Sequence, residues 1–520
     1  MQADSATTNS ELCDEEYAKI NLLLSKSKTP DQILSIFGVR NPFILYIWLS
    51  MAMVWALAAM PMMSGAFLID DGCPAAVMSS NRTTISAKCT PKNGSIRAEL
   101  GLNENQNYLV DLSTSAFMGG MAVGSAITPI FTDLLGRRSV LVAILLIAGG
   151  SGCLSAISTS INVLIALRFV QGLSFSGVSL TNWVLAYECI PMELRALSPL
   201  VFGLAWVFGY CLIAPMAYFT SNWRLLIVLV SAPSLLFVVI FYFTIPESFH
   251  YLAIKGRIDL IIQWVKMANS FADIVQTDKV EQSDVDQLIE YLEQQKLLMD
   301  NIDHQPVLIT KSISENGRKM VINSSPFIEK IKTNQRLIKH IAIFILLWVC
   351  DSFIYYGVSL FSTKLAGNRY INFTLIALVE VPSYVFSPWL IDRMGRRLFT
   401  AFTHLLAALA FFSGTSIFWL PNVPPFVQLC LWLIAKFAIA SSFTGLFVYA
   451  SEVFPTSKRG ICMGICTTVS QLCCIILPPM IRVMLSFSPM VPMLFFGGYA
   501  FIATFLTFLL PETRGRELPD

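Results

Sequence analysis

Long apolar stretches dominate the chain and are separated by short polar segments. Many of them contain no Asp, Glu, Lys or Arg for more than about 20 residues, the length that a helix needs to cross a bilayer. They lack the alternation of barrel strands, and a lipid-facing backbone must satisfy its own hydrogen bonds, so we predict helices. The predicted spans are twelve, near 43–67, 108–132, 139–158, 161–184, 194–219, 224–244, 338–361, 371–391, 398–420, 425–449, 460–483 and 490–510.

These spans predict an all-α membrane protein with two six-helix halves, at 43–244 and 338–510. A long loop at 70–107 follows the first span. The polar segments 1–42, 245–337 and 511–520 are predicted to be cytosolic. The first forty residues are polar and acidic, without a basic stub before a short apolar core, so no cleavable signal peptide is predicted.

The distribution of basic residues predicts the orientation of the spans. Loops assigned to the inside are richer in Lys and Arg than those outside, which is the positive-inside bias. Both termini are then cytosolic, and the plasma membrane is the default location. The inside loops hold Arg137, Arg138, Arg195, Arg393, Arg396, Arg397, Lys458 and Arg459.

The loop at 70–107 is predicted to lie outside the cell. It contains two glycosylation sequons, at Asn81 and Asn93. Of the chain's 12 cysteines, only Cys73 and Cys89 fall in this oxidising loop, so we predict one disulfide between them.

Composition supports the membrane interpretation and excludes several other classes. The chain is 55% hydrophobic and 13% charged, about half the charged share of a soluble domain. Lys+Arg number 36 against 34 Asp+Glu, so there is no basic excess for nucleic acid. No phosphate-binding loop or metal-ligand spacing is present, and no nucleophile–base pair appears in the spans. We therefore expect no cofactor, no bound metal and no enzymatic activity. The expected partners are the bilayer and a small organic ion. The sequence does not determine the oligomeric state.

Three motifs occur twice in the same order, which indicates a duplicated half. Repeats of this kind are typical of secondary transporters, whose substrate site lies between the halves near the midplane. The pairs are Pro129-x3-Asp133-x2-Gly136-Arg137-Arg138 with Pro388-x3-Asp392-x2-Gly395-Arg396-Arg397, Glu188-x2-Pro191-x3-Arg195 with Glu452-x2-Pro455-x3-Arg459, and Pro246-Glu247-Ser248 with Pro511-Glu512-Thr513.

The motifs combine acids and arginines on the predicted cytosolic side. Such groups can form charge networks between helices that close the inner gate in one state and break in the other. The alternative is that the basic residues only set orientation. We favour gating because the acids and the glycine recur with the arginines. The gating candidates are Asp133, Arg137, Arg138, Glu188, Arg195, Asp392, Arg396, Arg397, Glu452 and Arg459.

Taken together, the motifs resemble the major facilitator superfamily over nearly the whole chain. Arg168-x2-Gln171-Gly172 and Pro511-Glu512-Thr513-Arg514-Gly515 belong to this resemblance. Within it, Ala377-Leu378-Val379-Glu380-Val381-Pro382, Lys436-Phe437 and Leu518-Pro519-Asp520 are similar to the organic cation/carnitine/anion solute-carrier family. The first external loop is shorter than in that family and has fewer cysteines. The resemblance implies a transporter of small organic ions that works by alternating access.

Three charged residues inside the spans are the main substrate-binding candidates: Asp351, Glu380 and Lys436. Each costs about 2.5–3.5 kcal/mol to insert, so a function is expected. Trp348, Asp351 and Tyr355 share one helix face with Phe344, and an acid among aromatic rings suits an organic cation. The alternatives are that the aromatic stripe packs against other helices or lipid, and that Glu380 and Lys436 pair only with each other.

In the resembled family, one position in span eleven is typically acidic in cation carriers and arginine in anion carriers. That position here is Gln471, which cannot select charge. Two acids against one lysine in the spans favour a cationic or zwitterionic substrate. The alternatives are an organic anion transporter of the same fold and a transport-inactive membrane receptor or scaffold.

Overall fold

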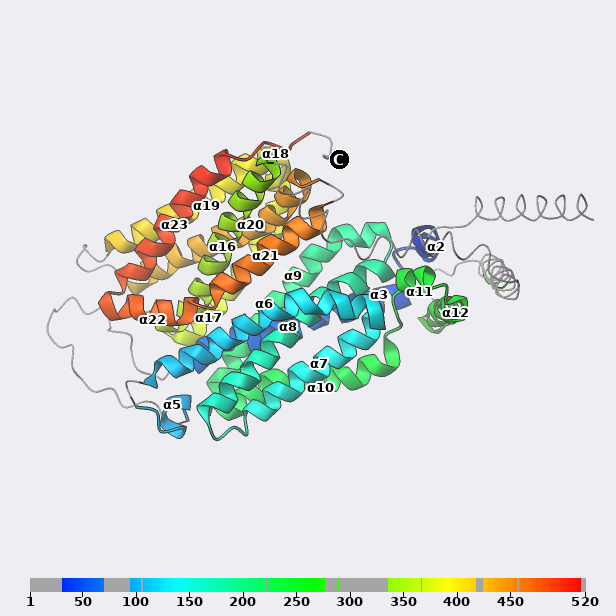
Figure 1. The fold of residues 1–520 in the computed structure, drawn as a ribbon, viewed down its shortest axis with the longest axis horizontal. Helices are drawn as coiled ribbons and strands as arrows, with labels where there is room; N and C mark the ends of the chain where they lie inside the picture. The colour runs from blue at the N-terminus through cyan, green and yellow to red at the C-terminus, as the bar shows by residue number, and fades with distance from the viewer. Residues whose placement is uncertain are drawn as a thin grey trace, which may run out of the picture. The chain divides into compact units, whose positions relative to one another are not determined.

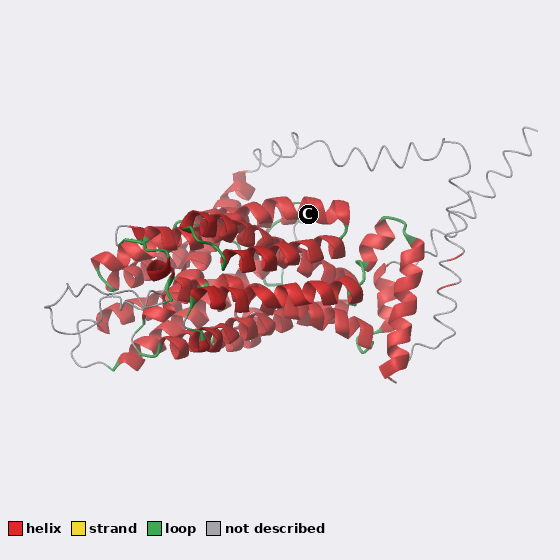
Figure 2. Ribbon diagram, turned by 90° about the horizontal axis from the view of Figure 1, so that it is seen from below, coloured by secondary structure: helices red, strands yellow, loops and turns green. Residues whose placement is uncertain are grey.

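The computed structural model describes residues 30–69, 94–103, 106–220, 222–275, 289, 293, 335–365, 367–417, 424–455 and 458–515. Every regular element in these ranges is a helix, as Figure 2 shows. The predicted glycosylation sites Asn81 and Asn93 and the predicted disulfide partners Cys73 and Cys89 lie outside the described residues.

The predicted all-α fold with twelve spans is confirmed. Eleven helical spans within the described ranges are long and apolar enough to cross a membrane, and a bent pair supplies the twelfth. The N-terminal half consists of α3 (Pro42–Met63) with α4 (Gly65–Leu68), α6 (Tyr108–Leu135), α7 (Arg137–Ser155), α8 (Ile161–Cys189), α9 (Met192–Phe219) and α10 (Trp223–Thr244).

The C-terminal half has the same number of spans, and two of them are interrupted. α17 and α18 adjoin at Val379 and together make one span, while α21 and α22 meet at a bend of 45°. The second interruption precedes Pro478 and Pro479, which have no N–H to donate to the preceding turn. The helices are α16 (Gln335–Phe361), α17 (Arg369–Leu378), α18 (Glu380–Met394), α19 (Arg396–Ser416), α20 (Pro425–Val453), α21 (Arg459–Cys474), α22 (Leu477–Phe487) and α23 (Met490–Phe508).

The chain divides into two compact units. The larger comprises 49–185, 197–247 and 305–520 and contains most of both helical halves. Within it, α7 packs on α10, α19 packs on α20 and α23, and the halves join where α6 packs on α21 and α22 (Figure 1). We call the end of this unit at which α6 begins the first-loop end. The opposite end, at which α6 ends and α7 and α19 begin, is the motif end.

The smaller unit comprises 1–48, 186–196 and 248–304. Its described part includes α2 (Pro30–Phe37), α11 (Phe249–Ile254) and α12 (Ile258–Val275). The fully buried Trp264 forms its core, with ring centroids 5.9 Å from Phe37, 5.4 Å from Phe43 and 5.0 Å from Phe249. This aromatic cluster gives the unit a core of its own.

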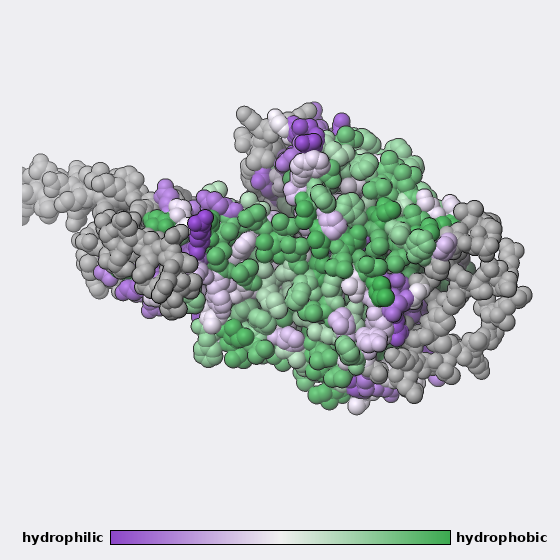
Figure 3. All heavy atoms as spheres, turned by 180° about the vertical axis from the view of Figure 1, so that it is seen from behind, coloured by the Kyte–Doolittle hydropathy of each residue, from purple (hydrophilic) through white to green (hydrophobic). Residues whose placement is uncertain are grey.

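The surface of the larger unit is broadly apolar. Figure 3 shows one face on which hydrophobic side chains form a wide, nearly continuous area with polar groups at its edges. Phe243 is 78% exposed and Ile130 is 60% exposed. A patch of this extent is rare on a water-soluble monomer, and it suits helices that lie in lipid.

Close packing inside the N-terminal half depends on glycine. A Cβ at Gly172 on α8 would lie 1.9 Å from the Phe117 carbonyl oxygen of α6, and one at Gly120 would lie 2.0 Å from the Phe169 oxygen. The backbones of α6 and α8 can therefore touch only because these residues have no side chain, as is common between membrane helices.

Candidate functional site

The repeated motifs at the motif end form the same helix cap in each half. Gly136 and Gly395, with φ of 96° and 86°, directly precede α7 and α19. Glu247 Oε1 accepts hydrogen bonds from the N–H groups of Arg137 at 2.8 Å and Arg138 at 3.0 Å. A carboxylate at this position satisfies N–H groups that a helix start leaves free.

Glu512 repeats this arrangement in the C-terminal half. Its carboxylate accepts from the N–H groups of Arg396 at 3.0 Å and Arg397 at 3.2 Å. Burial raises the pKa of Glu512, but the N–H groups of Arg514, Arg396, Thr513 and Arg397 outweigh it and hold the pKa below the usual value. The glutamates of the third motif pair therefore tie the last helix of each half to the start of its third.

The arginine side chains of these motifs pair with acids of their own half. Arg137 lies 3.1 Å from Asp133, and the matching Arg396 lies 3.4 Å from Asp392. Arg396 also lies 2.9 Å from Glu452, whose other carboxylate oxygen accepts a 2.6 Å hydrogen bond from Thr513. Three of the predicted gating residues of the C-terminal half, Asp392, Arg396 and Glu452, are thus connected by their side chains.

The second motif of the N-terminal half lies in the smaller unit. Glu188 accepts a hydrogen bond from the Ser248 hydroxyl, as Glu452 does from Thr513. Arg195 lies 2.6 Å from Asp31 and donates to the Tyr187 carbonyl at 2.8 Å. Its counterpart Arg459 differs, because its Nε and one terminal nitrogen have no hydrogen-bond partner among the described residues.

Tyr355 is the centre of a buried polar cluster between the halves. Its hydroxyl donates to Glu380 Oε2 at 3.0 Å and accepts from the indole N–H of Trp206, on α9 of the other half, at 2.9 Å. Tyr384 also donates to Glu380 Oε2, at 3.4 Å, and its ring packs over Gly203 of α9. Two of the predicted substrate-binding residues, Tyr355 and Glu380 of the C-terminal half, therefore meet where that half contacts α9 of the N-terminal half.

Lys436 completes this cluster. Its ammonium lies 2.9 Å from Glu380 Oε1, outside the direction of a hydrogen bond, so the attraction is that of an ion pair. It also donates to Ser359 Oγ at 2.9 Å and lies 3.2 Å from the centre of the Tyr355 ring. Glu380 and Lys436 are both fully buried, and pairing makes such burial tolerable. The pairing considered from the sequence is thus present in the structure.

Asp351 lies one helical turn from Tyr355 but belongs to a different cluster. Its Oδ1 is 2.9 Å from His404 Nε2, and its Oδ2 accepts a 3.0 Å hydrogen bond from the Ser442 hydroxyl. No Lys or Arg pairs with it among the described residues. His404 was not among the predicted site residues, because a lone histidine in an apolar span carries no spacing signal.

Two further predicted substrate-binding residues have no hydrogen bond to either cluster among the described residues. Trp348 is buried against Phe447, with ring centroids 5.0 Å apart, and its carbonyl accepts from Ser470 at 3.2 Å. Gln471, on α21, is half-buried, and its Oε1 has no hydrogen-bond partner in the described part of the chain.

An ion pair joins the halves at the first-loop end. Asp111, in the first turn of α6, is paired with Arg482 on α22, with one terminal guanidinium nitrogen 2.9 Å from Oδ1. Nearby, Phe67 stacks on Tyr370 with ring centroids 5.7 Å apart, and Thr363 donates to the Ala66 carbonyl at 3.3 Å. Asp111 and Arg482 were not among the predicted site residues, because each lies at a span edge where a charge is ordinary.

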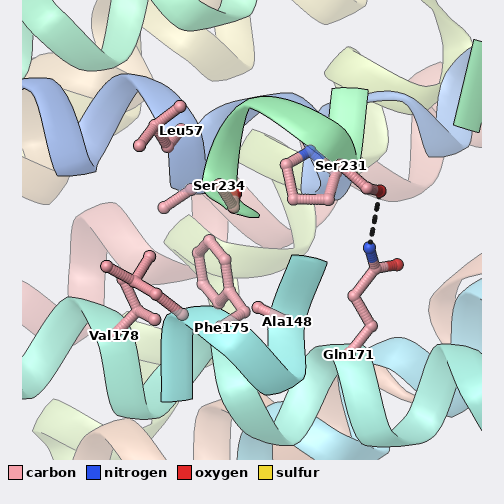
Figure 4. Close-up of a pocket in the computed structure, with 10 residues that line it drawn as sticks. Leu57, Ala148, Gln171, Phe175, Val178, Ser231 and Ser234 are labelled. Atoms are coloured by element: carbon pink, nitrogen blue, oxygen red, sulfur yellow. Dashed lines mark hydrogen bonds between the residues drawn. The ribbon is translucent and has the colours of Figure 1, made fainter. Parts of the chain in front are cut away.

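A small pocket lies in the N-terminal half, away from these charges. Figure 4 shows it between α3, α7, α8 and α10, beside the 3.1 Å hydrogen bond from Gln171 to Ser231. Its free space suits about one water molecule, too little for an organic substrate. We therefore place the candidate site by its chemistry, at the Tyr355 cluster.

Known proteins resemble the chain in both sequence and fold. A putative transporter of Caenorhabditis elegans is 29% identical over 523 residues, covering 100% of this chain and 96% of that protein. Organic cation/carnitine transporter 2 of Homo sapiens is 27% identical over 432 residues, covering 82% and 70%. Organic anion transporter 3 of Rattus norvegicus is 25% identical over 416 residues, covering 80% and 72%.

Among solved structures, the inward-open conformation of the Escherichia coli xylose transporter XylE has a TM-score of 0.64 at 17% identity, covering 91% of this chain and 98% of XylE. This likeness supports the fold. Residues 69–520 match the family described as sugar (and other) transporter. The predicted superfamily is therefore confirmed: the chain is a multi-pass membrane transporter, not an enzyme, and it belongs to the sugar (and other) transporter family of the major facilitator superfamily.

Proposed function

We propose that the protein is a secondary transporter that moves small cationic or zwitterionic organic molecules by alternating access. The observation that carries this proposal is the Tyr355 cluster. One tyrosine contacts an acid, an ammonium group and the opposite half of the transporter. Substrate sites of such transporters lie between the halves, so a ligand bound here would contact both.

Lys436 indicates which ligands the cluster could accept. Its side chain is an alkylammonium held between an aromatic face and the Glu380 carboxylate. An organic ammonium could take the same position by cation–π attraction, worth about 0.5–2 kcal/mol, and by pairing with Glu380. The displaced Lys436 would then be free to bind a carboxylate, so a zwitterion would satisfy both charges.

The organic cation/carnitine relative supports this choice, whereas the anion relative supports the main alternative. In that alternative, an organic anion binds Lys436 and displaces Glu380. Asp351 favours the cation, because it adds a second acid without adding a Lys or Arg partner within the described residues. A transport-inactive receptor is the third possibility, and measurable flux would exclude it.

The contacts between the halves support the proposed motion. In this structure Asp111 and Arg482 hold the first-loop end together, while Arg137 and Arg396 bond to acids of their own halves at the motif end. We propose that the motif end is cytosolic, that the membrane is the plasma membrane, and that the motif networks rearrange across the halves in the outward-facing state.

Uptake into proteoliposomes tests the proposal. We expect saturable uptake of labelled tetraethylammonium or carnitine, and little uptake of para-aminohippurate. Glu380→Gln and Asp351→Asn should each reduce cation uptake at least about tenfold, because each removes a buried countercharge worth over about 1.4 kcal/mol. Glu193→Gln, which changes an exposed acid at the start of α9, is the matched control. Saturable uptake of the anion alone would contradict the cationic proposal, and no flux of any compound would favour the receptor.

A further inference from the structure

The Asp351–His404 couple is a buried acid and base with no role in the substrate contacts described above. Both side chains are fully buried, on α16 and α19 respectively. His404 Nδ1 lies 2.8 Å from the Thr400 carbonyl oxygen. Because a carbonyl can only accept a hydrogen bond, this network requires the proton to be on Nδ1.

That assignment leaves a single position for a further proton, between His404 Nε2 and Asp351 Oδ1, which are 2.9 Å apart. With one proton there, the couple is neutral overall, either as carboxylic acid and imidazole or as carboxylate and imidazolium. Without it, two acceptors face each other and the couple has a net charge of −1. A contact of 2.9 Å between these two atoms is a hydrogen bond only when this proton is present.

Ser442 could stabilise both states. Its hydroxyl donates to Asp351 Oδ2 at 3.0 Å and lies 3.3 Å from His404 Nε2. When the shared proton leaves, a rotation of this hydroxyl could give Nε2 a donor. A buried imidazole and carboxylate with such a switchable partner form a proton-binding site rather than a fixed ion pair.

The other ionisable groups near the couple carry no net charge that would compensate a change in its charge. Cys350, beside Asp351, and Tyr499 on α23 are close enough to interact with it electrostatically, but thiols and phenols are neutral near pH 7. On the neighbouring α18 and α20, Glu380 and Lys436 neutralise each other. Gain or loss of one proton thus changes the net charge of this region.

We propose that Asp351 and His404 together bind one proton, which they take up from water. This proton is exchanged for an organic cation during transport. This inference rests on the proposed function and adds the coupling ion. The proton leaves to water as the cation enters, so the buried net charge is conserved. The Asp351–His404 couple and the Tyr355 cluster share two helices. Asp351 and Tyr355 both lie on α16, and Ser442 and Lys436 both lie on α20. A shift of these helices against each other would therefore affect both sites.

Proton release on ligand binding tests the exchange directly. Purified transporter in weakly buffered detergent solution, with a pH-sensitive dye, is mixed with tetraethylammonium, which has no titratable proton. We expect release of up to about one proton per bound cation, and an apparent Kd that rises by up to about tenfold per unit fall in pH. Asp351→Asn and His404→Gln should abolish both effects, whereas His340→Gln, a histidine at the motif end of α16, should retain them.

The outcomes separate this inference from the proposed function. Binding of tetraethylammonium without proton release or pH dependence would overturn the inference and leave the cation transporter standing. Absence of binding at any pH, with carnitine also inactive, would overturn the proposed function and the exchange with it.

Histidine NMR of the unsubstituted protein tests the proton site without any substrate, and a variant is needed only to assign the signal. The chain has only 4 histidines, so ¹⁵N-histidine labelling gives few signals, and His404→Gln identifies the relevant one. We expect a proton on Nδ1 throughout, and gain or loss of one proton at Nε2 or its partner as the pH is changed. A proton resident on Nε2 alone, or no change with pH, would overturn the proposal.

Discussion

The most deeply buried cations of the two halves, Arg168 and Lys436, are held in opposite ways. In the N-terminal half, Arg168 is 1% exposed and is held by neutral groups: the Pro61 carbonyl at 3.1 Å, Gln171 at 2.8 Å and the Phe117 ring. In the C-terminal half, Lys436 lies 2.9 Å from Glu380. Neutral partners suit a cation that stays in place, whereas a charged partner suits one that can be exchanged for a ligand.

Packing follows the same division. In the N-terminal half, α6 and α8 touch backbone to backbone at Gly172 and Gly120. In the C-terminal half, Gly445 of α20 faces the ring of Phe399, a side chain that can rotate. We infer that the N-terminal half is the more rigid partner and that rearrangement on substrate binding is concentrated in the C-terminal half.

Removal of the exchangeable cation should have the largest effect. Lys436→Met leaves Glu380 buried without its ion-pair partner, so we expect a loss of about 3–5 kcal/mol of unfolding free energy. The double variant Lys436→Met/Glu380→Gln should regain most of this stability, because no unpaired charge remains, while transport stays absent. Thermal unfolding in detergent measures the first effect and uptake the second. If the double variant is no more stable than the single one, the ion pair does not stabilise the fold as argued.

A methyl group at the helix contact should cost somewhat less. Gly172→Ala places a Cβ 1.9 Å from the Phe117 carbonyl oxygen, so two backbones must move apart, at about 1–3 kcal/mol or more. Gly445→Ala should cost less, because the Phe399 ring can give way. Gly150→Ala, where no atom lies within 4 Å, is the control and should stabilise α7 by up to about 1 kcal/mol. Equal losses at Gly172 and Gly445 would remove the packing difference between the halves.

Arg168 provides the direct counterpart of Lys436. Arg168→Met leaves only neutral acceptors without a partner, at a cost of about 1–3 kcal/mol, and no substitution of an acid should rescue it. Thermal unfolding of this variant beside Lys436→Met measures the contrast. A loss as large as that of Lys436→Met would mean that the two cations are buried in equivalent ways.

The sequence predicted the spans and the repeat because both are recorded as patterns along the chain. It also predicted Asp351, Glu380 and Lys436 as site residues, since charge in an apolar span is rare, and Tyr355, since it shares a helix face with Asp351. It could not group Asp351 with His404 and Ser442. These two residues lie 53 and 91 positions from Asp351, and the three residues belong to three different helices. Nor could it reveal that Trp206 of the other half contacts Tyr355, because tryptophan is ordinary in a span.

The capping role of Glu247 and Glu512 could not be predicted from the sequence either. The repeated Glu247 and Glu512 were visible as a motif, but their partners are the backbone N–H groups of residues more than a hundred positions away. Side-chain patterns do not show where the N–H groups of a helix start will lie. The motif therefore has a structural role that applies whether or not its arginines also gate transport.

The smallest predicted effect concerns these caps and the dependence of stability on pH. The pKa of Glu512 is lowered in the folded protein, so its stabilisation is fully present above the unfolded value of about 4.3 and is lost as the pH falls through the lower folded value. Glu512→Gln should remove this contribution to acid destabilisation and lower stability slightly at pH 7. Glu247→Gln, which alters the matching cap of the N-terminal half, provides the comparison. Thermal unfolding of both variants over an acidic pH series measures the effect, and an unchanged acid limb in Glu512→Gln would show that the cap on α19 does not stabilise the folded state.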